Sequence, residues 1–89
     1  MTKTYVVTGA ASGIGRALTE KLSDNNVVFA SYRKSEHADI LKNISPNIFP
    51  FYLDYSNQDT IVAAANYIKN KCTHIDTLVN IQDVLLQVR

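Results

Sequence analysis

The sequence predicts an α/β fold built on a parallel sheet, because two kinds of apolar pattern alternate along the chain. Short runs rich in β-branched and aromatic residues, which are typical of buried strands, occupy residues 4–8, 27–32, 48–53 and 76–80. Stretches with apolar residues at helical spacing lie between these runs. The resulting order β-α-β-α-β-α-β favours a doubly wound parallel sheet with helices on its faces.

The four strand segments read "TYVVT", "VVFASY", "IFPFYL" and "DTLVN" in chain order. Pro46 precedes the third segment, and Pro50 lies within it. Because proline lacks a backbone N–H, Pro50 predicts that this segment is an edge strand or ends there.

Three helices are expected between the strands, each with an apolar face. The first face would contain Ile14, Ala17, Leu18 and Leu22. The second, weaker face would contain Ala38, Leu41 and Ile44, and the third and clearest Ile61, Ala64, Ala65, Ile68 and Cys72. The predicted N-caps are Ser35 for the second helix and Ser56 or Asn57 for the third. Asp59 would place a negative charge near the N-terminus of the third helix, where the helix dipole is positive.

The size and composition indicate one small soluble domain. The chain has 89 residues, 46% of them hydrophobic and 19% charged, with a net charge of +1. This charge predicts no general attraction to nucleic acid or to membranes. We expect a cytoplasmic protein, because the start of the chain does not resemble a signal peptide, no run is long enough to cross a membrane, and Cys72 is the single cysteine.

The most informative stretch is "TGAASGIG", residues 8–15, which follows the first strand and opens the first helix. In this context Gly9 would allow a tight turn, Gly13 would let the backbone approach a diphosphate, and Gly15 would let the helix pack closely on the sheet. The helix N-terminus would supply free N–H groups. The stretch therefore predicts a dinucleotide site, the alternative being a glycine-rich turn with no ligand.

This stretch resembles the Thr-Gly-x-x-x-Gly-x-Gly motif of the short-chain dehydrogenase/reductase family. The resemblance covers residues 3 to about 80 and implies the first half of a Rossmann-like sheet in the strand order 3-2-1-4. "IDTLVN" resembles the family's fourth strand, which continues into Asn-Asn-Ala-Gly, whereas this chain continues as Asn80-Ile81-Gln82-Asp83. We therefore expect a dinucleotide-binding half-domain at residues 1–80 and a divergent tail at residues 81–89, which forms a strand, a short helix or a cover for the sheet edge.

The resemblance also implies which residues contact the dinucleotide. Asp54 in "FYLDYSN" matches the aspartate that contacts the adenine in the family, with Tyr55 beside it. The implied cofactor-binding residues are Gly9, Ser12, Gly13, Ile14, Gly15, Arg33, Asp54, Tyr55 and Asn80.

The end of the second strand favours NADP over NAD. In the family's alignment the acidic residue that holds the ribose hydroxyls in NAD sites corresponds to Ser31, and Arg33 follows it. An arginine side chain can form two parallel hydrogen bonds to a 2′-phosphate. The alternative is a solvated surface arginine. The family often places a second basic residue at the position of Ser12.

The family's chemistry requires a serine and a Tyr-x-x-x-Lys pair that follow the fourth strand, and the 89 residues contain no counterpart there. Tyr67 and Lys71 have the same spacing, but they lie on the third helix and are expected to form a helix-surface pair. His37 and His74 have no partner at metal-ligand spacing, and Cys72 is expected to pack in the core. Neither catalytic residues nor a metal site are therefore expected.

These observations lead to one function and two alternatives. The chain is expected to be an NAD(P)-binding piece of an oxidoreductase, and this piece is expected to be inactive alone. Its classification as an enzyme is left open. The alternatives are a non-enzymatic module that binds nucleotide or a partner subunit, and an enzyme completed by a separate chain. The open edge of the fourth strand predicts self-association. The substrate cannot be read from these residues.

Overall fold

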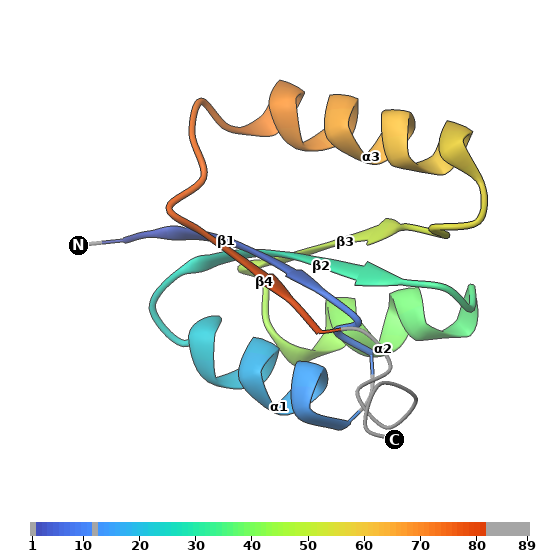
Figure 1. The fold of residues 1–89 in the computed structure, drawn as a ribbon. Helices are drawn as coiled ribbons and strands as arrows, with labels where there is room; N and C mark the ends of the chain where they lie inside the picture. Colours follow the sequence, from blue (N-terminus) through green and yellow to red (C-terminus); the bar gives the residue numbers. More distant parts are fainter. Residues whose placement is uncertain (1, 12, 82–89) are drawn as a thin grey trace, which may run out of the picture.

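The computed structural model describes residues 2–11 and 13–81, and it contains the four strands and three helices that the sequence predicts (Figure 1). The expected tail at residues 81–89 lies, apart from Ile81, outside the described residues. The strands are β1 (Thr4–Thr8), β2 (Val27–Tyr32), β3 (Ile48–Tyr52) and β4 (Thr77–Asn80). The helices are α1 (Gly13–Leu22), α2 (Glu36–Ile44) and α3 (Gln58–Lys71). The third and fourth strands are each one residue shorter than the sequence predicts.

The strands form one parallel sheet in the order β3-β2-β1-β4, which confirms the predicted fold class. The first strand, β1, is therefore internal, and Val6 has Phe29 of β2 on one side and Leu78 of β4 on the other. Because the strands are parallel, their carboxyl ends share one edge of the sheet, and the loops that follow them lie close together.

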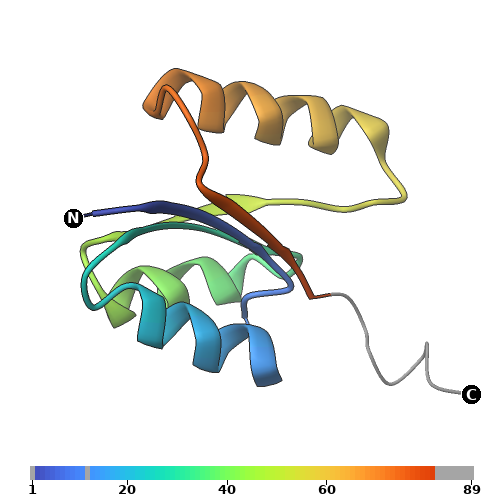
Figure 2. The ribbon, with the colours of Figure 1, turned by 60° about the vertical axis from the view of Figure 1, so that its left-hand side comes forward.

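Two apolar layers lie on opposite faces of the sheet because neighbouring strand residues point in opposite directions. Val6, Phe29 and Phe51 pack with Ala64 and Ile68 of α3 on one face. Val7, Val28, Ala30 and Ile48 pack with Leu41 of α2 on the other. Figures 1 and 2 show α3 alone on its side of the sheet, with α1 and α2 together on the opposite side. The structure is thus a three-layer αβα arrangement.

The buried face of α1 differs from the predicted one. Ile14 and Ala17 are exposed and Leu18 and Leu22 are half-buried, whereas Gly15, Thr19 and Ser23 are buried. The hydroxyls of Thr19 and Ser23 donate to the carbonyls of Gly15 and Glu20 at 2.8 and 2.9 Å. Since these hydroxyls are satisfied by the helix itself, small polar residues can face the sheet and bring the helix close to it.

The other two helices follow their predicted faces more closely. Leu41 is fully buried in α2, with Ala38 and Ile44 half-buried beside it. In α3, Ala64 and Ile68 are buried and Cys72 packs against them, as predicted, but Ile61 and Ala65 are exposed. Within the described ranges, no helix has both the length and the apolar character needed to cross a bilayer.

Only one of the predicted caps is present. Asn57 Oδ1 accepts a hydrogen bond from the backbone N–H of Asp59 at 3.0 Å, so Asn57, not Ser56, caps α3. Ser35 precedes α2 but makes no capping hydrogen bond, because its backbone is already helical (φ −57°, ψ −32°). A side-chain cap requires an extended backbone at that position, so the prediction for Ser35 is wrong.

The two edges of the sheet are β3 and β4. The backbone N–H of Leu53 donates to Tyr32 and that of Val28 donates to Asn47, so the odd-numbered residues of β3 face β2. Pro50 consequently faces outward, where its missing N–H removes no ladder bond, which confirms the predicted edge position. At the other edge, β4 is largely exposed, and Leu78 is 64% exposed.

Candidate functional site

The glycine-rich loop leaves the carboxyl end of β1 and turns directly into α1. Gly9 has a φ of +68°, a backbone conformation that residues with a side chain rarely adopt. A Cβ at this position would also lie 1.8 Å from the carbonyl oxygen of Ile81, after β4. Gly9 therefore provides the tight turn that the motif predicts and also makes room for the chain that follows the neighbouring strand.

Gly13 and Gly15 serve two different purposes. Gly13 has a φ of +59°, and a Cβ there would meet no other atom within 4 Å. A Cβ at Gly15 would lie 1.9 Å from the carbonyl oxygen of Gly9, so Gly15 lets the helix start against the loop. The space beside Gly13 is open to a ligand at the N-terminus of α1, where the unpaired N–H groups favour an anion. Ser12 lies outside the described residues.

Ser31, near the end of β2, is buried and engaged with the loop. Its side-chain oxygen accepts the N–H of Gly9 at 2.9 Å, and its carbonyl accepts the N–H of Ala10 at 3.2 Å. Ser31 is only 4% exposed. It thus fixes the start of the glycine loop to the end of β2 and places no negative charge there.

Arg33 and Asp54 extend the site beyond β2 and β3. The guanidinium and the carboxylate are 3.9 Å apart, and the arginine side chain is 72% exposed against 20% for the aspartate. Hydrogen bonds from the hydroxyl and the backbone N–H of Ser56 lower the pKa of Asp54, and the charge of Arg33 makes a smaller contribution. Asp54 is therefore an ionised acceptor at neutral pH.

Thr60 anchors the loop that carries Asp54. Its hydroxyl accepts the N–H of Asp54 at 3.0 Å and lies 2.8 Å from the carbonyl oxygen of Asp54 and 2.7 Å from that of Asn57. The hydroxyl has a single proton, so it can donate to one of these carbonyls at a time. The first turn of α3 thus holds Asp54 in place.

Asn80 connects three strands at their carboxyl ends. Its Oδ1 accepts a hydrogen bond from the hydroxyl of Thr8 at 2.6 Å and a second one from the hydroxyl of Tyr55 at 3.2 Å. Two donors on one oxygen fix the orientation of the amide, so its NH₂ group is available to donate. Sequence reasoning missed the contribution of Thr8, although it is the first residue of the glycine motif.

The structure brings the predicted site residues that it describes to one end of the sheet. The loop from Gly9 to Gly15 follows β1, Arg33 follows β2, Asp54 and Tyr55 follow β3, and Asn80 ends β4. Ile14 is 68% exposed at the start of α1, which leaves an apolar side chain free to contact a ligand. This arrangement offers backbone donors for a diphosphate, an exposed cation and an ionised acceptor, which are groups that suit an adenine dinucleotide.

Tyr67 and Lys71 lie elsewhere. Lys71 Nζ is 5.2 Å from the Tyr67 ring centroid and 5.8 Å from that of Phe49, which is near the amino end of β3. Lys71 is exposed on the helix, but Tyr67 is half-buried and packs against Phe29 and Phe51, so the predicted helix-surface pair is only partly correct. Among residues 2–11 and 13–81, no three His, Cys, Asp or Glu side chains are grouped as a metal site would require.

Comparison with known proteins identifies the family. Residues 3–81 match the family described as short chain dehydrogenase. An uncharacterized oxidoreductase, YxbG of Bacillus subtilis, is 35% identical over 83 residues, which are 88% of this chain but only 30% of the relative. The chain thus spans about a third of the length of the curated relatives that it matches.

Solved structures give the same result. The actinorhodin polyketide ketoreductase F189W, solved with NADPH, has a TM-score of 0.80 and 25% identity over 90% of this chain and 33% of its own. YwfH, an NADPH-dependent reductase involved in bacilysin biosynthesis, has a TM-score of 0.80 and 26% identity over 92% of this chain and 35% of its own. With its matched glycine loop and its 3-2-1-4 sheet, the chain belongs to the short-chain dehydrogenase family.

Proposed function

We propose that residues 1–80 form the dinucleotide-binding part of a short-chain dehydrogenase and hold the ADP half of the cofactor. The observation that carries this proposal is the geometry of the glycine loop. Gly9 turns the chain at a positive φ, and Gly13 leaves an open approach to the N-terminus of α1. A diphosphate at that place would accept hydrogen bonds from the free N–H groups of the helix and would be favoured by its dipole.

The proposed cofactor is NADP. Ser31 supplies no carboxylate for the ribose hydroxyls, and its side-chain oxygen is already bonded to Gly9. Arg33 is highly exposed, and its contact with Asp54 is long, so its guanidinium can turn toward a 2′-phosphate with little loss. The NADPH in the names of two structurally similar reductases supports the same choice.

Titration calorimetry with 2′-phospho-ADP-ribose and with ADP-ribose tests this proposal. A charge-assisted hydrogen bond contributes about 1.5–3 kcal/mol, so Arg33 should favour the phosphorylated ligand about 10- to 150-fold. Arg33→Ala should remove this preference, while Lys21→Ala, in the last turn of α1, should retain it. Equal affinities for the two ligands in the unsubstituted chain would contradict the NADP assignment, and no binding of either would contradict the dinucleotide site.

We also propose that these 89 residues do not transfer hydride by themselves. Positioned acid catalysis contributes about 10²- to 10⁴-fold, and the Tyr67–Lys71 pair lies away from the glycine loop. NADPH oxidation should therefore stay at background with a panel of ketones and acyl thioesters. Turnover that disappears in Tyr67→Phe would show instead that this pair is catalytic.

A further inference from the structure

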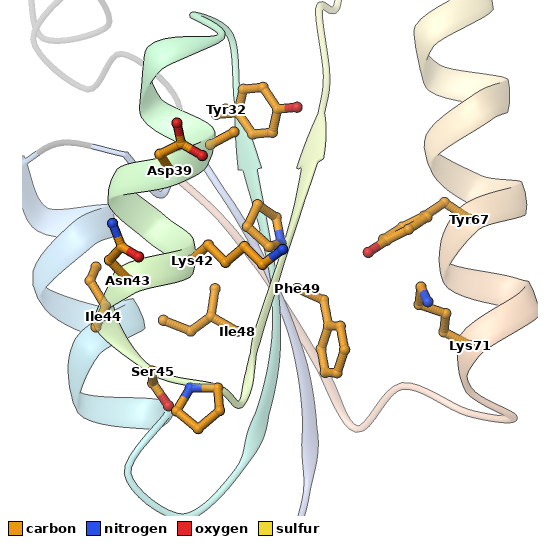
Figure 3. Close-up of a pocket in the computed structure, with 13 residues that line it drawn as sticks. Tyr32, Asp39, Lys42, Asn43, Ile44, Ser45, Ile48, Phe49, Tyr67 and Lys71 are labelled. Carbon is orange, nitrogen blue, oxygen red and sulfur yellow. The ribbon is translucent and has the colours of Figure 1, made fainter.

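A groove runs along the outer edge of β3, between α2 and α3, with a volume of about 940 Å³ (Figure 3). Volumes of about 300–1,000 Å³ are typical of small-molecule sites. Its apolar lining comes from both faces of the sheet and includes Ile48, Phe49, Pro46 and Pro50. None of its residues belongs to the dinucleotide site described above.

The backbone at this edge is poorly suited to pairing with another strand. Of the outward-facing residues, Ile48 donates its N–H to the carbonyl of Ser45, and Pro50 has no N–H. An added strand would therefore find acceptors but no donors at these two positions. This chemistry disfavours an extended peptide or a second copy of the chain as the occupant, and it offers carbonyl oxygens to a small ligand that carries an N–H.

The polar side chains of the groove favour an anion. Lys42 from α2 and Lys71 from α3 both line it, against one carboxylate, Asp39. Figure 3 shows Lys42 and Tyr67 extending toward β3 from opposite sides. Burial raises the pKa of the Tyr67 hydroxyl, with a smaller contribution from Tyr32, so this hydroxyl remains a hydrogen-bond donor at neutral pH.

The aromatic side chains hold one of these cations in place. Lys71 Nζ lies 5.8 Å from the Phe49 ring centroid and 5.2 Å from that of Tyr67. Cation–π contacts of this kind orient an ammonium group while leaving its N–H groups able to donate. The groove thus combines a flat apolar lining with an oriented positive charge and a phenolic donor.

We propose that this groove binds a small aromatic carboxylate, with its carboxylate between Lys42, Lys71 and the Tyr67 hydroxyl and its ring against Phe49 and the prolines. Indole-3-acetate is a suitable probe, because its ring N–H can donate to the free edge carbonyls. The chain contains no tryptophan, so indole fluorescence reports only the ligand. Tryptophol, the matched alcohol, has the same ring without the charge.

Fluorescence anisotropy of each probe, titrated with the 89-residue chain, tests the proposal. Indole-3-acetate should bind saturably and about tenfold or more tightly than tryptophol, since a charge-assisted hydrogen bond is lost with the alcohol. Lys42→Met and Lys71→Met should each weaken the binding of indole-3-acetate by about tenfold. Lys69→Met, an exposed lysine of α3 outside the groove, should leave it unchanged.

Saturating 2′-phospho-ADP-ribose should not displace the probe, because the groove and the glycine loop share no residue. Circular dichroism of each variant establishes that it is folded. Equal affinity for acid and alcohol, no effect of either groove lysine, or no binding by the folded chain would overturn the proposal. None of these outcomes bears on the dinucleotide titration, so the two proposals fail independently.

Discussion

The three glycines of the loop differ in what a methyl group would cost at each position. At Gly13 the added group enters open space, so the cost is that of the positive φ, about 1–2 kcal/mol. At Gly9 the same backbone cost is joined by a clash with the backbone of Ile81. At Gly15 alanine improves helix propensity by up to about 1 kcal/mol but clashes with the backbone of Gly9.

We therefore expect Gly13→Ala to fold and to lose affinity for ADP-ribose, because the methyl group occupies the proposed place of the diphosphate. Gly9→Ala and Gly15→Ala should be far less stable than Gly13→Ala in chemical denaturation. Calorimetry on the folded Gly13→Ala variant measures the ligand effect separately. Similar losses of stability in all three variants would show that Gly13 is packed as closely as its neighbours.

The sequence predicts residue roles well where the backbone decides them. The positive φ of Gly9 and Gly13 and the close approach at Gly15 follow from a motif whose glycines each have a geometric reason. The hydrogen bonds from the N–H of Gly9 to Ser31 and from the hydroxyls of Thr8 and Tyr55 to Asn80 were not predictable. They join residues 22 to 72 positions apart, and a single sequence contains no signal for such pairs.

Among the elements, α1 shows where periodicity fails. Counting apolar residues selects Ile14 and Ala17, which are exposed, and overlooks Thr19, which is fully buried. The hydroxyl of Thr19 bonds to the preceding turn and leaves the methyl group to face the sheet. A count of apolar residues therefore cannot predict that this polar residue is buried. For α2 and α3 the pattern correctly predicts the central buried positions, Leu41, Ala64 and Ile68, although it also includes the exposed Ile61 and Ala65.

The helix starts provide a direct test at this scale. Asn57→Ala should lower the free energy of unfolding by about 0.5–2 kcal/mol, because the N–H of Asp59 loses its acceptor. Ser35→Ala, the matched change before α2, should have almost no effect since that side chain makes no capping bond. Urea denaturation of both variants gives the comparison. Equal destabilisation would mean that Ser35 caps α2 in solution.

At the scale of the whole molecule, the two sheet edges are not equivalent. Pro50 and the Ile48–Ser45 bond leave β3 without a free donor at two of its outward-facing residues, whereas β4 presents Leu78, 64% exposed, at the opposite edge. No other described strand covers β4 on that side. We propose that the 89-residue chain self-associates there, because an exposed apolar edge strand invites pairing.

Sedimentation at micromolar concentration should therefore show dimers or larger species. Leu78→Lys should yield monomers, because a charged side chain on an edge strand opposes pairing and an exposed position tolerates it. Ile40→Lys, a substitution of an exposed apolar residue of α2, should leave the association unchanged. A monomeric unsubstituted chain would contradict the proposal.

The position of β1 inside the sheet determines the order in which the molecule can assemble. Its partners on the β4 side lie 72 residues away, where Thr4 N–H meets Asp76 and the Thr8 hydroxyl meets Asn80. Strands β1 to β3 and their helices need only shorter loops to close, so we propose that β4, which carries the largest closure entropy, docks last. Because Gly9 lies against Ile81, the glycine loop reaches its final shape only at that step. On this proposal, the proposed dinucleotide site is completed at the end of folding and is lost first when the chain begins to open.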